Sequence, residues 1–196
     1  MSKWLNEIEL EGSLVKLVPL RKEHRDDLLK ASADGELWKL WYTSVPSEKT
    51  IDNYIDVVLA EWEKDKALPF VVMDKKANKV IGATRFCNAT PEHRRAEIGY
   101  TWYAQSYQRT GVNTECKYLL LTHAFETLGC IAVEFRTHWY NLASRNAIAR
   151  IGAKQDGVLR NHQIDGEGAI RDTVVFSILR DEWKVVKKSL LFKMSH

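Results

Sequence analysis

Hydrophobic and polar positions follow two different spacings along the chain. Stretches in which every second residue is apolar, typical of strands, alternate with stretches whose apolar residues recur every three to four positions, typical of helices. Strands are predicted at 13–18, 70–73, 80–86, 96–103, 131–137, 158–164 and 169–179. Helices are predicted at 22–33, from near Ser47 to Trp62, at 112–128, at 141–151 and from Asp181 onward. This order predicts a mixed α/β fold, with one domain over residues 1–196.

The loop at 104–111 joins a predicted strand to the longest predicted helix. The first turn of a helix exposes N–H groups without intrahelical partners and carries partial positive charge. Gly111 lets the backbone approach an anion closely, and Arg109 offers a cation to a diphosphate or a ribose 3′-phosphate. A single glycine before a helix is more often a plain turn. A Walker A loop and a dinucleotide fingerprint are both excluded, because their further glycines and lysine are absent.

Composition narrows the class of protein. The chain is 45% hydrophobic and 28% charged, which is typical of a soluble globular protein. The apolar stretch around 119–121 is far shorter than the ~20 residues of a membrane span. Residues 1–7 lack the apolar centre of a secretory signal. We therefore expect a cytoplasmic protein without a membrane partner.

Charge and metal-ligand chemistry exclude further classes. The net charge of +3, from 29 basic and 26 acidic residues, is too balanced to predict nucleic-acid binding. Cys87, Cys116 and Cys130 are odd in number and widely spaced, so we expect buried thiols rather than disulfides or a zinc ribbon. The six histidines contain no His-x-x-x-His pair, and no metal cofactor is expected.

Several stretches together resemble the GNAT acetyltransferases. Residues 97–100 and 107–115 are similar to the coenzyme A signature Gln/Arg-x-x-Gly-x-Gly/Ala, in which Gln108 and Gly111 match and Asn113 replaces Gly or Ala. Residues 141–146 with 151–153 resemble the next conserved helix of that family. The opening 10–20 and the closing 171–174 with 182–183 resemble the RimJ/RimL-type branch, whose namesakes acetylate ribosomal-protein N-termini. The resemblance spans roughly residues 8 to 183.

The resemblance implies a GNAT-type fold, with a mixed, mostly antiparallel central sheet of six to seven strands flanked by helices. It implies acetyl-CoA as acyl donor and direct attack of a primary amine on the thioester. The acceptor is then a peptide N-terminus or a small molecule. The implied cofactor-binding residues are Trp102, Tyr103, Gln108, Arg109, Thr110, Gly111, Val112, Asn113, Thr114, Asn141 and Asn146. We expect Asn113 to donate a hydrogen bond to the pyrophosphate rather than to crowd it.

The attacking amine has to be neutral. At pH 7 a lysine with pKa ~10.4 is neutral in about one part in 2,500, and an α-amine near ~7.8 in about one part in seven. Glu97 and Glu134 are the candidate general bases, and Glu97 is the better placed, because its strand lines the acyl site in the family. The alternative for Glu97 is a surface carboxylate paired with Arg94 or Arg95.

The thiol that leaves needs a proton. Ile148 occupies the position where many GNAT enzymes have an acidic Tyr, so that group is absent. Ser144 matches the serine that RimL-like enzymes are thought to use for the thiol, although it could equally cap or pack in its helix. Ile148 and Asn113 keep a second class of function open, a catalytically silent acyl-CoA-binding or regulatory module.

The acceptor side carries weaker signals. Trp38, Trp41 and Tyr42 lie where the first two helices often cover the acceptor in the family, and core packing is their default interpretation. His162 either faces the acceptor or is an exposed structural histidine. The C-terminal helix leaves a homodimer open through Trp183, Val186, Leu190 and Phe192.

Overall fold

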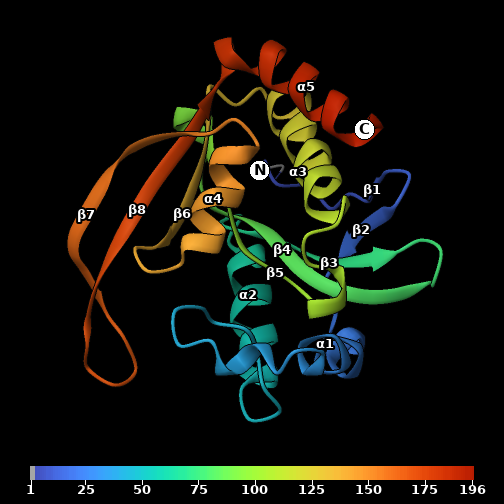
Figure 1. Cartoon of the computed structure of the whole chain (residues 1–196), viewed down its shortest axis with the longest axis vertical. Coiled ribbons are helices and arrows are strands. Elements are labelled where there is room, and N and C mark those ends of the chain that lie inside the picture. The colour runs from blue at the N-terminus through green and yellow to red at the C-terminus, as the bar shows by residue number, and fades with distance from the viewer. Residues whose placement is uncertain (1–2) are drawn as a thin grey trace.

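The structure of the chain, a computed structural model, describes residues 3–196. The strands are β1 (Leu10–Glu11), β2 (Val15–Pro19), β3 (Leu68–Asp74), β4 (Lys79–Thr90), β5 (Arg95–Tyr103), β6 (Ala132–His138), β7 (Lys154–Ile164) and β8 (Ile170–Leu179). The α-helices are α1 (Arg25–Ala33), α2 (Ile51–Glu63), α3 (Val112–Thr122), α4 (Leu142–Arg150) and α5 (Arg180–Ser195). All eight strands form one sheet in the order β1-β2-β3-β4-β5-β6-β8-β7 (Figure 1).

One pair of strands sets the geometry of the sheet. Every neighbouring pair is antiparallel except β5 and β6, which run parallel. Their pairing covers only three positions, from Arg95 opposite Ala132 to Glu97 opposite Glu134. Beyond that point β5 continues to Tyr103 and β6 to His138 without pairing. The two strands therefore part at Glu97 and Glu134.

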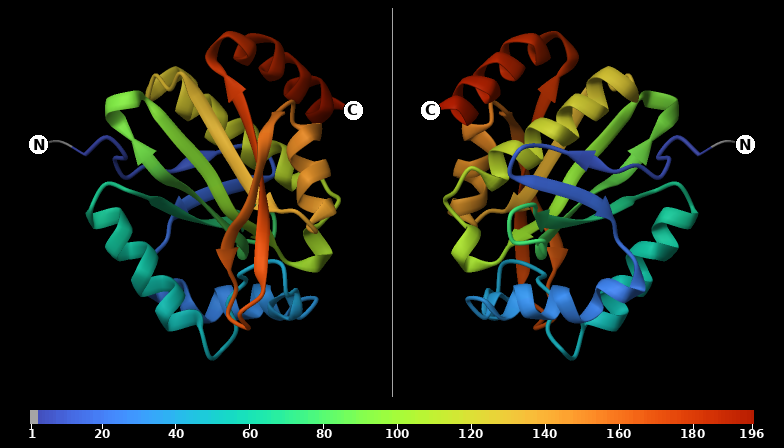
Figure 2. Two further views of the ribbon diagram at one scale, coloured as in Figure 1. Left: turned by 90° about the vertical axis from the view of Figure 1, so that its left-hand side faces the viewer. Right: turned by 90° about the vertical axis from the view of Figure 1, so that its right-hand side faces the viewer.

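The two faces of the sheet are covered unequally. On one face lie α3, α4 and α5 (Figure 2). These helices share a continuous apolar core with side chains from β2 to β6 and from β8. On the other face the core formed with α1 and α2 takes sheet residues only from β2 to β5. Since β6 and β8 turn their second set of side chains to that same face, polar residues can lie there without being buried under a helix.

A bulge in β5 changes which side chains meet which core. The register between β4 and β5 shifts between Arg85 and Ala83, and Tyr100 at that point has φ +51°. Ala96 and Ile98 lie in the core under α3, whereas Trp102 beyond the bulge lies in the core under α1 and α2. A bulge of this kind re-aims side chains and is common beside functional sites. It therefore gives the start of β5 and the segment that leads into α3 different side-chain orientations.

A buried carboxylate anchors α3 to the first hairpin of the sheet. Glu115 accepts hydrogen bonds of 2.8 Å from the backbone N–H groups of Ser13, Leu14 and Val15. Gly12 leaves room for it, because a Cβ there would lie 2.4 Å from the carboxylate carbon of Glu115. The first turn of α3 is thereby fixed relative to β2.

All predicted strands and helices are found, and the α/β class with a mostly antiparallel sheet is confirmed. The sheet has an eighth strand, β1, whose two residues are too few to give a periodic pattern. The second helix begins at Ile51 rather than near Ser47, because Ser47 closes a separate turn whose carbonyl accepts from Thr50 and Ile51. The longest predicted helix continues past α3 as a π-helical turn, His123–Thr127, and ends before Gly129, which has φ +67°. None of the helices in residues 3–196 is both long and apolar enough to cross a bilayer.

Candidate active site

The loop before α3 is held by its own side chains. Gln108 donates from Nε2 to the carbonyl of Tyr103 at 3.0 Å, and Thr110 donates from Oγ1 to the carbonyl of Tyr107 at 2.7 Å. The N–H of Val112 donates to Thr110 Oγ1 at 3.3 Å. Gln108 and Thr110 therefore shape the loop, and the next N–H groups of the first turn stay available to a ligand.

Arg109 and Gly111 stand at the mouth of this turn. Gly111 has φ −66° and ψ −16°, so it does not need the conformational freedom of glycine. Arg109 is exposed at φ +59°, and its guanidinium pairs with no residue in the described range. An uncovered helix start with a free cation beside it fits an anionic phosphate group.

Several of the predicted cofactor residues contribute no side chain to a ligand. Trp102, Tyr103, Val112 and Thr114 are buried, so only their backbone groups can face a cofactor. Asn113 differs: its Oδ1 accepts from the Tyr103 hydroxyl at 3.3 Å. That contact turns the carbonyl oxygen of Asn113 inward and leaves its amide N–H groups as donors, which is compatible with the predicted hydrogen bond to pyrophosphate.

The start of α4 carries the second group of predicted residues. Asn141 is the N-cap, and its Oδ1 accepts from the N–H of Ser144 at 3.0 Å. Ser144 is half-buried one turn into the helix, and its hydroxyl bonds to nothing among residues 3–196. Asn146 is exposed, and Ile148 is buried in the core under α3. Asn141 thus acts as a cap, while the Ser144 hydroxyl keeps its hydrogen-bonding capacity.

Sequence reasoning missed Arg150 as a site residue. Arg150, at the end of α4, donates from a terminal nitrogen to Thr114 Oγ1 at 2.8 Å, across 36 positions of the chain. This contact brings a second cation to the first turn of α3. No motif pointed to it, because only the packing of α4 against α3 joins the two residues.

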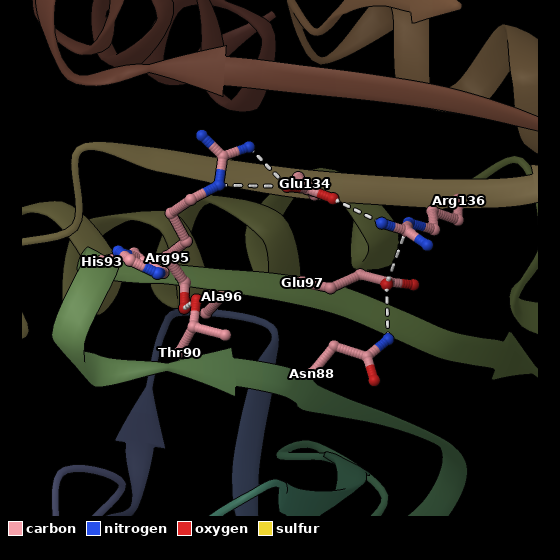
Figure 3. Close-up of a pocket in the computed structure, with 8 residues that line it drawn as sticks. All are labelled: Asn88, Thr90, His93, Arg95, Ala96, Glu97, Glu134 and Arg136. Atoms are coloured by element: carbon pink, nitrogen blue, oxygen red, sulfur yellow. Dashed lines mark hydrogen bonds and ion pairs between the residues drawn. The ribbon is translucent and has the colours of Figure 1, made fainter. Parts of the chain in front are cut away.

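Glu97 lies at the point where β5 and β6 part. It is only 6% exposed and lines a cavity of about 340 Å³ that includes residues from β4, β5 and β6 (Figure 3). Asn88 Nδ2 donates to Glu97 Oε2 at 2.8 Å, and Arg136 Nε lies 3.5 Å from the same oxygen. The interpretation of Glu97 as a surface carboxylate paired with Arg94 or Arg95 is wrong, because its strand position places it inside this cavity.

The environment of Glu97 favours a proton acceptor. Burial raises the pKa of Glu97, against the lowering effects of the Asn88 hydrogen bond and the Arg136 charge. Gly99 stands two residues along the strand, where a Cβ would lie 3.1 Å from Glu97 Oε1. A carboxylate whose pKa is raised by burial, beside an open cavity, suits general base chemistry.

Glu134 lines the same cavity, but its charged neighbours differ from those of Glu97. It pairs with Arg95 and with Arg136, the latter at 3.1 Å (Figure 3). Burial acts to raise the pKa of Glu134, but the hydrogen bonds from the two arginines outweigh it and the pKa is lowered. With both of these guanidinium partners in place, Glu134 is a poorer proton acceptor than Glu97.

An aromatic cluster lies on the same face of the sheet. Trp41, 65% exposed, contacts Tyr42, His138 and Tyr140 at ring-centroid distances of 5.5, 5.1 and 5.9 Å. Core packing was the wrong interpretation of Trp41, because the segment between α1 and α2 crosses to the end of β6. His162 is exposed and shares a hydrogen bond of 3.0 Å with Thr173, which supports a structural role.

Comparison with known proteins identifies the family. Residues 15–154 match the Acetyltransferase (GNAT) domain family. The chain belongs to the GNAT acetyltransferase family. Membership of this N-acetyltransferase family makes it an enzyme of that class, as the resemblance implied.

Individual relatives within the GNAT family show which branch this chain resembles. YdaF of Bacillus subtilis (strain 168), provisionally named a ribosomal N-acetyltransferase, is 28% identical over 152 residues, covering 74% of this chain and 79% of YdaF. The structure of an acetyltransferase from T. thermophilus superposes with a TM-score of 0.84, at 32% identity, over 97% of this chain and 98% of that one. RimJ of Mycobacterium smegmatis, solved in complex with CoA-disulfide, shares the fold with a TM-score of 0.78 at 22% identity, over 95% and 93% of the chains. The RimJ/RimL-like resemblance is confirmed.

Proposed function

We propose that this GNAT enzyme transfers an acetyl group from acetyl-CoA to a primary amine by direct attack of the amine on the thioester. The observation that carries the proposal is the parting of β5 and β6 at Glu97 and Glu134, between the free helix start of α3 and the polar face of the sheet. One side of this gap fits an anionic cofactor and the other fits an amine. Acetyl-CoA, when bound, supplies the activated acyl group.

The cofactor end is assigned to α3 and α4. The N–H groups of the first turn of α3, the amide of Asn113 and the guanidinium of Arg109 hold the pyrophosphate. Arg150 adds a cation beside Thr114. Asn141 and Ser144, at the start of α4, face the pantetheine arm. Trp102, Tyr103, Val112 and Thr114 take part through backbone groups, and Gln108 and Thr110 by shaping the loop.

The amine end is assigned to the cavity at Glu97. Its carboxylate takes the proton that the amine loses, either directly or through water, and the Arg136 and Asn88 contacts orient it. An α-amine needs less help than a lysine, since far more of it is neutral at pH 7. Peptide N-termini and small α-amines are therefore the preferred acceptors.

Stabilisation of the departing thiolate is assigned to Ser144, whose hydroxyl donates a hydrogen bond to the sulfur while the thiolate takes its proton from water. Ile148 is apolar and buried, so it provides no acid. Ser144 has a free hydroxyl half-buried in the first turn of α4, where the helix dipole favours negative charge on a nearby thiolate.

The test is release of free thiol from acetyl-CoA with and without a panel of amines, followed with a thiol-reactive chromophore. We expect acetyl-CoA to bind and thiol release to depend on the amine. Binding without thiol release across the panel would instead indicate a silent acyl-CoA-binding module. Absence of acetyl-CoA binding would overturn the proposal.

A further inference from the structure

Arg171 is partly buried, its Nε is inaccessible to solvent and has no hydrogen-bond partner, and it forms no ion pair within residues 3–196. Arg85 Nε is also buried without a hydrogen-bond partner, but Arg85 pairs with Glu61 at 3.4 Å. The guanidinium groups of Arg94 and Arg109 also lack a partner in that range, but both residues are exposed. A buried donor without a partner costs free energy, and a guanidinium costs more than a neutral group. An acceptor from outside the chain would remove this cost at Nε.

The register of the sheet places Arg171 on the polar face. Thr173 pairs with His138, and Arg171 lies two residues before Thr173 in β8. Arg171 is therefore on the same face, just beyond the end of β6. The charge of Arg171 contributes to a lowered pKa of His138, after the larger effect of burial. His138 in turn contacts Trp41 at 5.1 Å. Arg171 thus borders the aromatic cluster.

The bulge of β5 faces Arg171 from the other side of the gap. Burial lowers the pKa of Arg171, and the charges of Tyr100 and Asp165 act in the opposite direction. Tyr100 is the residue of the bulge with positive φ. The Arg85 guanidinium lies 3.4 Å from the centroid of the Tyr100 ring, on the same face of the sheet. Arg171, on β8, therefore lies across the gap from Tyr100 of β5, the residue before Thr101.

The carboxylates near Arg171 are already engaged. Asp165 accepts from the N–H groups of Glu167 and Ala169 at 2.9 and 2.8 Å, which holds it in the turn between β7 and β8. Asp172 pairs with Arg160 at 2.6 Å and accepts from the N–H of Asn161. Neither forms an ion pair with Arg171.

We infer that Arg171 binds a carboxylate of the acceptor, so that the preferred substrates are amines that carry a carboxylate within reach of the reacting nitrogen. The inference rests on the proposed function. The amine meets the acetyl group in the gap beside Thr101, Arg171 attracts the acid, and the Trp41 ring lies next to them beside His138. Glu97, about six strand residues or roughly 20 Å from the level of Arg171, receives the proton of the amine through water. A guanidinium binds a carboxylate in a bidentate geometry that a carboxamide cannot match. Arg171 is in this account a specificity residue.

The test uses pairs of amines that differ only in carboxylate against carboxamide. Peptides Ala-Glu-Ala and Ala-Gln-Ala, both with amidated C-termini, form one pair, and 4-aminobutyrate and 4-aminobutanamide form the small-molecule pair. Equilibrium binding to the protein saturated with CoA is measured by calorimetry, and kcat/KM is measured by thiol release. We expect the acid of at least one pair to bind about tenfold or more tightly than its amide. In Arg171→Gln that ratio should fall to within about twofold.

Arg94→Gln is the matched control, because it removes an equal charge from an exposed arginine whose guanidinium has no partner in the described residues. It should keep the preference. Arg171→Lys should keep part of it, and serves as the second variant if Arg171→Gln fails to fold. Equal binding of acid and amide by the unaltered protein in both pairs overturns the inference, even if turnover proceeds. A binding preference without turnover would support Arg171 and contradict the proposed function instead.

Discussion

Nζ of Lys117, on α3, donates a hydrogen bond of 2.6 Å to Oγ1 of Thr101, just past the bulge of β5. Thr101 shares a further hydrogen bond of 2.7 Å with Thr84 on β4. Lys117 is only 5% exposed and has no carboxylate partner in residues 3–196. The helix assigned to the pyrophosphate is thereby tied to β5, which borders the gap between β5 and β6, by an amine that is buried without a counter-charge.

Lys117→Met should stabilise the protein at neutral pH. Burial lowers the pKa of Lys117 from 10.5 to about 8. Because the folded-state pKa is the lower one, protonation opposes folding below about pH 8, and stability rises with pH between about 8 and 10.5. Methionine removes that penalty of about 3 kcal/mol but also the hydrogen bond to Thr101, for a net gain of about 1–3 kcal/mol at pH 7.

Urea unfolding of Lys117→Met and the unaltered protein at pH 7 and pH 10 measures this. The gain should shrink at pH 10, because the folded protein then holds Lys117 as the neutral amine and most of the penalty for its burial is gone. Lys184→Met, at an exposed position of α5, is the control and should show no such pH dependence. A destabilised Lys117→Met at both pH values would mean that the buried amine is favourable.

Glu97→Gln should lower kcat by about 10²–10⁴-fold and leave acetyl-CoA affinity unchanged, since the amide cannot accept a proton. Glu134→Gln should cost less than about tenfold, because Arg95 and Arg136 already hold that carboxylate ionised. The pH profile adds a separate check. Burial raises the pKa of Glu97 above its ordinary value, so activity should fall as the pH drops through that raised pKa. Equal losses in the two variants would remove the distinction between the carboxylates.

Gly111→Trp should abolish acetyl-CoA binding in a folded protein. The backbone of Gly111 is in the ordinary helical region, and the nearest atom to a new Cβ is Leu14 Cδ1 at 3.0 Å. Leu14 is half-exposed, so its end can move aside. Gly166→Trp, in a turn where a Cβ meets nothing within 4 Å, is the control for adding an indole. Calorimetric titration measures the affinity of both variants for acetyl-CoA. Retained affinity in Gly111→Trp would mean that the pyrophosphate binds elsewhere.

Glu115→Gln should destabilise the fold by about 1–3 kcal/mol, because an amide offers one acceptor oxygen to three backbone N–H groups. Gly12→Ala should destabilise it as well, by pushing the carboxylate off those groups. In the double variant the two losses should not add, since both act on the same contacts. If chemical denaturation shows that the two losses in the free energy of unfolding add, Gly12→Ala acts through the backbone of Gly12 and not through the contacts of Glu115.

The sequence was informative where function depends on local pattern. Periodicity predicted the strand, loop and helix that place Gly111 at the start of α3, and the resemblance named Glu97 and Ser144 from short motifs. Two-residue β1 and the π-helical turn after α3 leave no such signal. The start of α2 was misplaced because Ser47, a typical cap residue, forms a turn of its own.

Contacts between distant segments could not be predicted. The burial of Glu97 depends on β6 supplying Arg136, and the exposure of Trp41 depends on where the segment after α1 meets the end of β6. Arg150 and Thr114 meet only because α4 packs beside α3. Arg171 was noticed as part of a motif, but its lack of a partner is a property of the folded chain.

The most direct test of the central claim is a crystal structure of the complex with acetyl-CoA. The account predicts the pyrophosphate against the N–H groups that follow Gly111, and the acetyl group in the gap between β5 and β6 near Thr101 and Glu97. A pyrophosphate bound away from the start of α3, or an acetyl group outside that gap, would contradict it.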